Sequence, residues 1–133
     1  MTVCVWGVGT SRFGRQPKRS AAELAWTAVQ EALDDAGVTE VDAAYVGTVF
    51  GAPGVAQRAL SGVGLTGLPI VTVENACASG TTAFHEAREA IRLGRYERVL
   101  ALGLEHLTSL FDGPIAPEGT DPEQASGLLL PAL

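Results

Sequence analysis

Residues 70–94 read IVTVENACASGTTAFHEAREAIRLG, and this stretch decides the fold. Its opening residues, Ile70–Val73, are mostly β-branched and predict a short strand. Its second half repeats apolar residues at helical spacing and ends at Gly94, which predicts a helix from near Cys77 to Leu93. A strand that passes directly into a helix is the repeating unit of parallel α/β proteins.

Strands and helices alternate on both sides of this stretch. Strands are predicted at residues 3–8, 43–50 and 99–104, and helices at residues 21–36 and 55–60. Ser20 and Glu23 have capping-box spacing at the start of the first helix, and Gly37 follows its end. The resulting βαβαβαβ order predicts an α/β fold with a mostly parallel sheet, right-handed crossovers and helices on both faces.

Two segments are expected at the carboxyl ends of strands, where ligands bind in open α/β sheets. They are residues 9–12, which read GTSR, and residues 75–77, which read NAC. The alternating pattern stops after residue 107, so we expect one α/β core at residues 1–107. Prolines, glycines and acidic residues fill residues 108–133, which are predicted to form an extended or poorly ordered tail.

Composition excludes several classes of protein. The 133 residues are 47% hydrophobic and 18% charged, which is typical of a globular domain rather than a disordered chain. The net charge of -6 argues against nucleic-acid binding, since the basic stretch at residues 12–19 is short and is interpreted as a solvated loop.

The two cysteines, Cys4 and Cys77, are too few for a disulfide framework, and no CxxC pattern indicates a metal site. Cys4 lies in an apolar run and is expected to be a small core residue. We find no signal peptide and no apolar run of about 18 residues, the length that a membrane span needs. These observations predict a reducing, cytoplasmic setting and no bound metal.

Cys77 stands where a predicted strand meets a predicted helix, among small residues that leave room for a substrate. The unpaired N–H groups and the dipole at a helix start favour an anion, so we expect the pKa of this thiol to be lowered and the thiolate to be available. The backbone N–H of Cys77 is also a candidate oxyanion donor. Considered by geometry alone, a buried structural cysteine is the favoured interpretation of Cys77, and a nucleophile is the alternative.

The run from Asn75 to Gly80, NACASG, resembles the nucleophile motif of the thiolase superfamily. The likeness is to the branch that contains sterol-carrier-protein-type thiolases and thiolase-like lipid-transfer proteins. Three further segments agree with that branch in order and spacing, at residues 8–14, 64–69 and 87–105. The resemblance implies the N-terminal half of a thiolase, with Cys77 as the acyl-carrying nucleophile and residues 108–133 as the start of the family's loop region.

The resemblance also implies a reaction. Cys77 takes an acyl group from a coenzyme A thioester, and a second acyl-CoA, deprotonated at its α-carbon, attacks that group to give a 3-ketoacyl-CoA; cleavage runs backwards. No bound cofactor is implied, and no coenzyme A-binding residue is assigned. An activating histidine, a second cysteine or equivalent acid/base, and part of the oxyanion hole come from a second half-domain, so we expect acyl-CoA acetyltransferase activity only when another chain supplies that half.

Neither histidine matches the family's activating histidine. Eight residues separate His85 from Cys77, which places the two side chains about two helical turns apart. His106 follows the last predicted strand; it lines the site or, in the favoured interpretation, packs in a loop. Both are therefore left out of the predicted catalytic set.

The family resemblance suggests partners as well. The strand from Ile70 to Asn75 corresponds to an edge that pairs across a two-fold axis in the family, and an unpaired apolar edge invites aggregation, so a homodimer or a larger complex is expected. Some relatives also associate with an accessory chain that carries a zinc ribbon and a small β-barrel. Three alternatives remain open: a non-catalytic interaction or lipid-transfer module, a ketosynthase, or an aldolase on the same scaffold.

Overall fold

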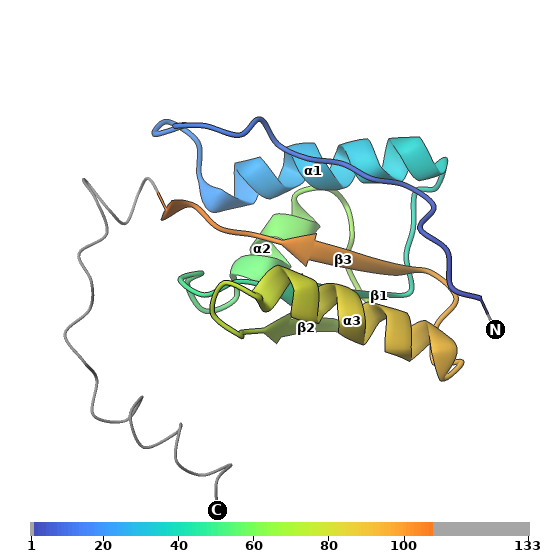
Figure 1. The fold of residues 1–133 in the computed structure, drawn as a ribbon. Coiled ribbons are helices and arrows are strands. Elements are labelled where there is room, and N and C mark those ends of the chain that lie inside the picture. Colours follow the sequence, from blue (N-terminus) through green and yellow to red (C-terminus); the bar gives the residue numbers. More distant parts are fainter. Residues whose placement is uncertain (1, 108–133) are drawn as a thin grey trace, which may run out of the picture.

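The computed structural model describes residues 2–107, which form one α/β layered unit (Figure 1). Three helices and three strands alternate along these described residues: α1 (Ala21–Ala36), β1 (Ala43–Gly47), α2 (Val55–Ser61), β2 (Ile70–Val73), α3 (Ser79–Arg92) and β3 (Val99–Gly103). The strands form one sheet in the order β2-β1-β3, and both pairings are parallel. The predicted parallel α/β class is confirmed, and the predicted tail at residues 108–133 lies outside the described residues.

Strand β1 is the centre of the sheet, and all five of its residues are buried. Ala44 pairs with Ile70 of β2 and with Leu100 of β3, so the three strands are in register across the sheet. Helices α1 and α2 pack on one face, and α3 covers the other, as Figure 1 shows. Helices therefore lie on both faces, as predicted.

Helix α1 begins and ends at the predicted residues. The Ser20 hydroxyl accepts a hydrogen bond from the Glu23 N–H at 3.2 Å, and the Glu23 carboxylate accepts one from the Ser20 N–H at 2.7 Å. The Ser20 N–H, together with the Ser20 side chain, lowers the pKa of Glu23. Gly37 ends the helix in the left-handed conformation, with a φ of 66°. The capping box predicted from the sequence is confirmed.

The predicted first strand, residues 3–8, is wrong. This segment is extended and runs beside α1, but it pairs with no strand of the described chain. The N–H of Val8 donates instead to a carboxylate oxygen of Asp35 in α1, at 2.9 Å. An extended segment with strand-like composition becomes a strand only when a partner backbone lies within hydrogen-bonding reach, and none of the described residues provides one.

The prediction that Cys4 is a core residue is also wrong, because its side chain is exposed. Its neighbours Val5 and Trp6 are exposed too, by 63% and 66%. All three belong to the unpaired segment, which explains why an apolar run is left uncovered. None of the helices in the described part of the chain has the length and apolar character needed to cross a membrane.

Candidate functional site

The candidate nucleophile lies at the junction between β2 and α3, at the carboxyl end of the sheet. Strand β2 ends at Val73 and α3 begins at Ser79, so Cys77 lies two residues before the helix, where the sequence placed it. Its side chain is exposed. An exposed thiol meets the first requirement for attack on a thioester, which is access, and the interpretation of Cys77 as a buried structural cysteine is wrong.

The backbone of this junction turns sharply. Ala76, immediately before Cys77, has a φ of +46°, the only positive φ among the described non-glycine residues. A positive φ costs free energy at alanine and persists only where neighbouring contacts hold it. One such contact comes from the Glu74 carboxylate, which accepts the Ala76 N–H at 2.6 Å.

Ser79 is the main clamp of the junction, and its side chain is buried although its neighbours are exposed. Its hydroxyl accepts the Asn75 N–H at 2.8 Å and donates to the Ala76 carbonyl at 2.7 Å. Asn75 in turn donates from its side-chain amide to the Thr82 hydroxyl at 3.1 Å. These bonds fix the backbone on both sides of Ala76 and therefore fix the direction of the Cys77 side chain.

Glycines allow the start of α3 to lie directly on the sheet. A methyl group at Gly47, the last residue of β1, would come within 2.3 Å of the Ser79 carbonyl carbon and oxygen. Gly80 and Gly103 face each other, because a methyl group built on Gly80 would lie 3.7 Å from the Gly103 Cα. These close backbone contacts fix the start of α3 against the ends of β1 and β3. They therefore also fix the position of Cys77, which lies just before α3.

Glu105 binds the loop that follows β1 to the end of β3. Its carboxylate accepts the N–H groups of Val49, at 2.9 Å, and Phe50, at 3.3 Å, and lies 3.5 Å from the Thr48 hydroxyl. The sequence motif contains Glu105, but no role for it was predicted. A signal was present, since an acidic residue directly after an apolar strand, at the ligand end of a sheet, often anchors a loop through its backbone N–H groups.

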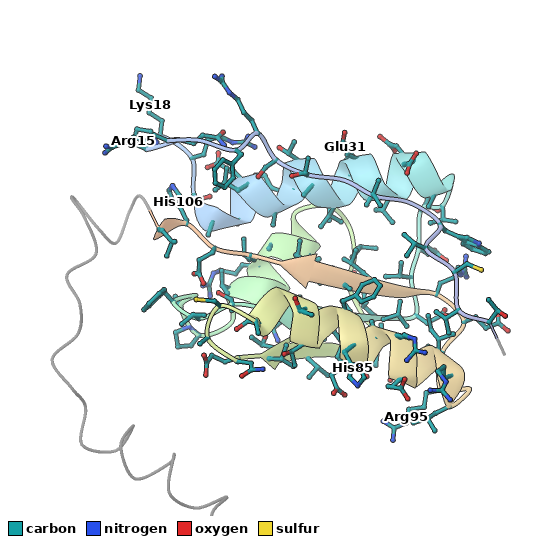
Figure 2. All side chains as sticks on the ribbon, in the orientation of Figure 1. Arg15, Lys18, Glu31, His85, Arg95 and His106 are labelled. Atoms are coloured by element: carbon teal, nitrogen blue, oxygen red, sulfur yellow. The ribbon has the colours of Figure 1, made fainter. Side chains whose placement is uncertain are left out.

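The two histidines lie apart from Cys77. His85 is exposed on α3, well away from the junction, as Figure 2 shows. His106 contacts the loop before α1, with its Nε2 atom 3.2 Å from the Gln16 carbonyl oxygen. These positions agree with leaving both histidines out of the catalytic set and with the loop-packing interpretation of His106.

The other segment predicted at the ligand edge does not join Cys77. Gly9, Thr10 and Ser11 line a small cavity of about 170 Å³ together with residues at the end of β3, and Cys77 is not part of its wall. The Thr10 N–H donates to the Glu31 carboxylate of α1 at 2.7 Å. The described residues therefore provide one site built around Cys77 and a separate cavity between residues 9–11 and β3.

The described residues therefore form an open parallel α/β sheet, and a cysteine is exposed at its carboxyl edge, between an edge strand and a helix. Residues 7–116 match the family model described as the thiolase N-terminal domain. The chain therefore belongs to the thiolase family, as an N-terminal domain.

Individual relatives agree with this assignment. The chain is 43% identical over 110 residues to sterol carrier protein 2 from Gallus gallus, a match that covers 79% of the chain and 20% of that protein. It is 33% identical over 141 aligned residues to an acetyl-CoA acetyltransferase from Methanothermobacter thermautotrophicus, covering 98% of the chain and 37% of that protein. The chain thus spans between a fifth and two fifths of these curated relatives.

A solved structure shows the same fold. The Acat5 thiolase from Ascaris suum, described in complex with coenzyme A, superposes with a TM-score of 0.63 at 24% sequence identity. That superposition covers 87% of this chain and 33% of the other. The parallel sheet and its helices are therefore those of a thiolase domain.

Proposed function

We propose that this chain is the nucleophile-bearing part of a thiolase-type acyl-CoA acyltransferase, completed by another chain. The observation that carries the proposal is the exposed Cys77, clamped at a strand-to-helix junction in a thiolase N-terminal domain. Coenzyme A thioesters are the proposed substrates, in keeping with the acetyl-CoA acetyltransferase among the relatives and the coenzyme A complex of the Ascaris thiolase.

In the proposed reaction, the Cys77 thiolate attacks the carbonyl carbon of an acyl-CoA. The carbon–sulfur bond to coenzyme A breaks, coenzyme A leaves as a thiolate that takes up a proton, and an acyl-cysteine remains. A base from the completing chain removes the α-proton of a second acyl-CoA, and the resulting carbanion attacks the acyl carbon. Cys77 then leaves as a thiolate, and the product is a 3-ketoacyl-CoA.

The chain's own residues orient the nucleophile in this proposal. Ser79, by its bonds to Asn75 and Ala76, holds the turn that presents Cys77. The start of α3 lies beside Cys77, and the N–H groups of a helix start can stabilise a developing oxyanion. Ser79 is therefore a positioning residue, and Cys77 is the proposed catalytic residue.

The remaining acid/base groups are proposed to come from a second polypeptide. Neither histidine lies at the junction, and the chain matches only 37% of the acetyl-CoA acetyltransferase from Methanothermobacter. A two-fold dimer through the strand from Ile70 to Asn75 is also proposed, because β2 lies at an edge of the described sheet and Val71 on it is 43% exposed.

The test produces the chain together with the remainder of the Methanothermobacter acetyltransferase, meaning the part beyond the region that aligns here. The purified complex is incubated with acetyl-CoA, and acetylation of each cysteine is measured by mass spectrometry. We expect an acetyl group on Cys77 and none on Cys4, which is also exposed and serves as an internal control. A complex in which Cys77 stays unmodified contradicts the catalytic proposal, and failure of the two polypeptides to associate contradicts completion by a second chain.

Sterol carrier protein 2 among the relatives favours a second candidate, a lipid-carrying module without catalysis. This candidate predicts that the chain binds a fluorescent fatty acid and that Cys77→Ala leaves the binding unchanged. Acetylation of Cys77 by acetyl-CoA, with no measurable binding of the fatty acid, would rule the candidate out.

A further inference from the structure

Three cations on the loop before α1 have no acceptor among the described residues. They are Arg12, Arg15 and Lys18, whose side chains are exposed and take part in none of the hydrogen bonds or ion pairs of residues 2–107. Most of the other arginines are already bonded, as Arg98 is to Asp42. Unpaired cations gathered on one short loop of a chain with a net charge of -6 indicate a site for an anion.

Phe13 lies between two of these cations and is fully exposed. Its exposed fraction of 103% is the highest among the exposed large hydrophobic residues of the described chain. A Cβ built on the next residue, Gly14, meets no atom within 4 Å, so no other part of the described chain crowds the loop there. Aromatic rings and guanidinium groups both stack on the flat face of a base. An exposed ring beside cations therefore matches the two parts of a nucleotide, a base and its phosphates.

The loop is held in place although its tip is exposed. The side-chain amide of Gln16 donates to the Arg12 carbonyl, and the Gln16 carbonyl accepts the Arg19 N–H at 3.1 Å. The Nε2 atom of His106 lies 3.2 Å from the same Gln16 carbonyl oxygen. The Arg19 guanidinium also donates to the Thr27 hydroxyl of α1, at 2.7 Å. A loop that is ordered before its ligand arrives loses less conformational entropy on binding.

The loop and the candidate nucleophile lie at the same end of the sheet. His106, which contacts the loop, follows β3, and Cys77 follows β2, so both come after the carboxyl ends of parallel strands. Figure 2 shows Arg15 and Lys18 at this end of the molecule and Arg95 at the opposite end. A ligand that reaches from the loop to the thiol must be long, with phosphates at one end and a reactive group at the other.

We infer that Phe13 and the three unpaired cations of this loop bind the phosphorylated adenosine end of the acyl-CoA whose thioester reaches Cys77. The inference rests on the proposed function, because that function supplies coenzyme A thioesters as the substrates. The guanidinium groups of Arg12 and Arg15 donate to phosphate oxygens, and Lys18 adds a further positive charge. The adenine ring stacks on Phe13, and the flexible pantetheine arm extends from the loop toward the thiol.

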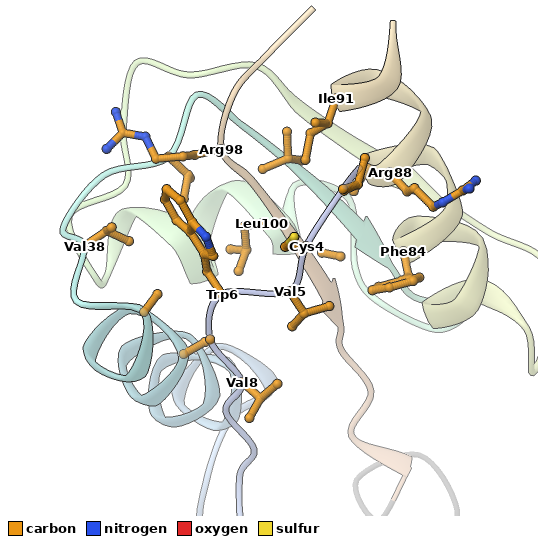
Figure 3. Close-up of a pocket in the computed structure, with 18 of the residues that line it drawn as sticks. Cys4, Val5, Trp6, Val8, Val38, Phe84, Arg88, Ile91, Arg98 and Leu100 are labelled. Carbon is orange, nitrogen blue, oxygen red and sulfur yellow. The ribbon is translucent and has the colours of Figure 1, made fainter. Parts of the chain in front are cut away.

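The groove between residues 2–9 and β3 does not offer such a site (Figure 3). Val5 and Val8 are among the apolar side chains that line it. Arg98 also lines the groove, but its guanidinium already lies 4.0 Å from the Asp42 carboxylate. A phosphate in these surroundings would lose its hydration without gaining an unpaired cation, and this loss costs free energy.

Binding of adenosine 3′,5′-bisphosphate to the unaltered chain tests the inference without a chemical step. The probe carries adenine and the phosphates of the coenzyme A nucleotide but has no pantetheine arm. We expect it to shift the amide NMR resonances of residues 12–19, and we expect adenosine, which has no phosphate, to bind at least about tenfold more weakly. Unchanged resonances of this loop at millimolar concentrations of the bisphosphate overturn the inference.

Substitutions on the loop and at the far end of the molecule provide a matched comparison. The double variant Arg15→Gln, Lys18→Gln should bind the bisphosphate at least about tenfold more weakly, whereas Arg95→Gln, at an exposed arginine of the opposite end, should bind it as the wild type does. Phe13→Ala should weaken binding about fivefold or more through the lost stacking. Its thermal unfolding midpoint should not change, because the ring is fully exposed. Equal affinities of the loop variants and Arg95→Gln contradict the inference.

Kinetics of the complex with the remainder of the Methanothermobacter acetyltransferase separate this inference from the proposed function. In the double loop variant we expect the KM for acetyl-CoA to rise about tenfold or more, with kcat unchanged, because the nucleotide is bound equally in the ground state and the transition state. The rate with S-acetylpantetheine, which has no nucleotide, should not change. An unchanged KM for acetyl-CoA refutes the loop site and leaves the catalytic proposal standing. Binding of the bisphosphate to the loop, with Cys77 left unmodified by acetyl-CoA, does the reverse.

Other anions that carry phosphates give outcomes of their own. A nucleic acid or a membrane brings many phosphates near an acidic chain, whereas one coenzyme A molecule contacts the loop alone. Competition experiments use ATP, a short single-stranded oligonucleotide and vesicles of anionic phospholipid against coenzyme A. We expect coenzyme A to displace the bisphosphate at the lowest concentration. Displacement at a lower concentration by any of the three assigns the loop to that ligand and refutes the inference.

Discussion

The two faces of the sheet are packed in different ways. On the face of α1 and α2, branched aliphatic side chains fill the space, and Val29, Val46 and Leu60 are essentially inaccessible to solvent. On the face of α3 the buried apolar side chains of the helix are alanines, Ala83, Ala87 and Ala90, which pack against Tyr45. Small residues let α3 approach the sheet closely, whereas large ones hold α1 and α2 further away.

The two faces therefore have different roles: one stabilises the fold, and the other positions Cys77. Burial of aliphatic area on the α1 side supplies most of the hydrophobic stabilisation. On the α3 side the same strand ends in Gly47, against which the first turn of α3 lies, and Cys77 immediately precedes that turn. Substitutions on the α1 and α2 face should therefore change stability alone. Substitutions on the α3 face should also change the reactivity of the Cys77 thiol.

The largest effect is expected for Leu60→Ala on the aliphatic face. Removing this fully buried side chain leaves a cavity, and we expect the free energy of unfolding to fall by about 2–5 kcal/mol. Urea denaturation measures the loss, and iodoacetamide alkylation of the native variant should proceed at the wild-type rate at Cys77. Leu93→Ala, at a residue 67% exposed, is the control and should change stability little. An altered alkylation rate of Cys77 in Leu60→Ala would contradict the proposal that the aliphatic face affects stability alone.

Gly47→Ala tests the opposite face. The added methyl group overlaps the Ser79 carbonyl, so we expect a loss of about 1–3 kcal/mol, with a changed alkylation rate at Cys77 because α3 must shift. Gly80→Ala is the matched control, since its methyl group would meet only the Gly103 Cα at 3.7 Å. If Cys77 is alkylated at the same rate in both variants, the distance of α3 from the sheet does not control the reactivity of the thiol.

Ser79→Ala removes the clamp but leaves the packing. The Asn75 N–H and the Ala76 carbonyl lose their partner, and we expect a cost of about 1–3 kcal/mol. Because the turn before Cys77 is then less fixed, alkylation of Cys77 should be slower. Thr81→Ala, an exposed position in the same helical turn, provides the comparison. Unchanged alkylation in Ser79→Ala would show that the hydroxyl serves stability alone.

The smallest effect is expected at the amino end of the sheet, which belongs to neither face. The Asp42 carboxylate accepts the N–H groups of Arg98, at 2.8 Å, and Glu97, at 3.0 Å, and these bonds hold its pKa below the ordinary value of 3.8. Because the folded pKa is the lower one, this stabilisation is complete well above pH 3.8 and is lost as the pH falls below it.

Asp42→Asn should therefore lower the unfolding midpoint at pH 6 slightly and should flatten its decline below pH 4, as measured by thermal denaturation across pH. Glu40→Gln, at a nearby exposed position, is the control. Identical pH profiles for Asp42→Asn and the wild type would contradict the assignment of this stabilisation to Asp42.

Local chemistry explains what could be predicted. Ser20 and Glu23 lie close in sequence and complete their capping box within one helical turn, and the strand Ile70–Val73 has the predicted bounds. Helix α3 begins two residues after Cys77, close to the start predicted from apolar residues at helical spacing. These features depend on neighbours along the chain, so a single sequence suffices to find them.

The site was predicted only in part, because its geometry depends on distant residues. Cys77 was identified from its place in the chain and from family resemblance. The clamp by Ser79 depends on the conformation of Ala76, and the loop anchor joins Glu105 to Val49 and Phe50, more than fifty positions away. Neither the composition of the sequence nor the spacing of its residues shows which backbone N–H group donates a hydrogen bond to a given carboxylate.

The sequence alone determined a parallel α/β domain with a cysteine between a strand and a helix, because apolar periodicity and capping are local. Only the tertiary structure decided that residues 3–8 lie along α1 without pairing with any strand of residues 2–107, and that Cys4 is exposed. The physical reason is that a strand requires a hydrogen-bonding partner. Composition expresses a preference for extended backbone, but the space on either side of that backbone decides whether the preference becomes a sheet.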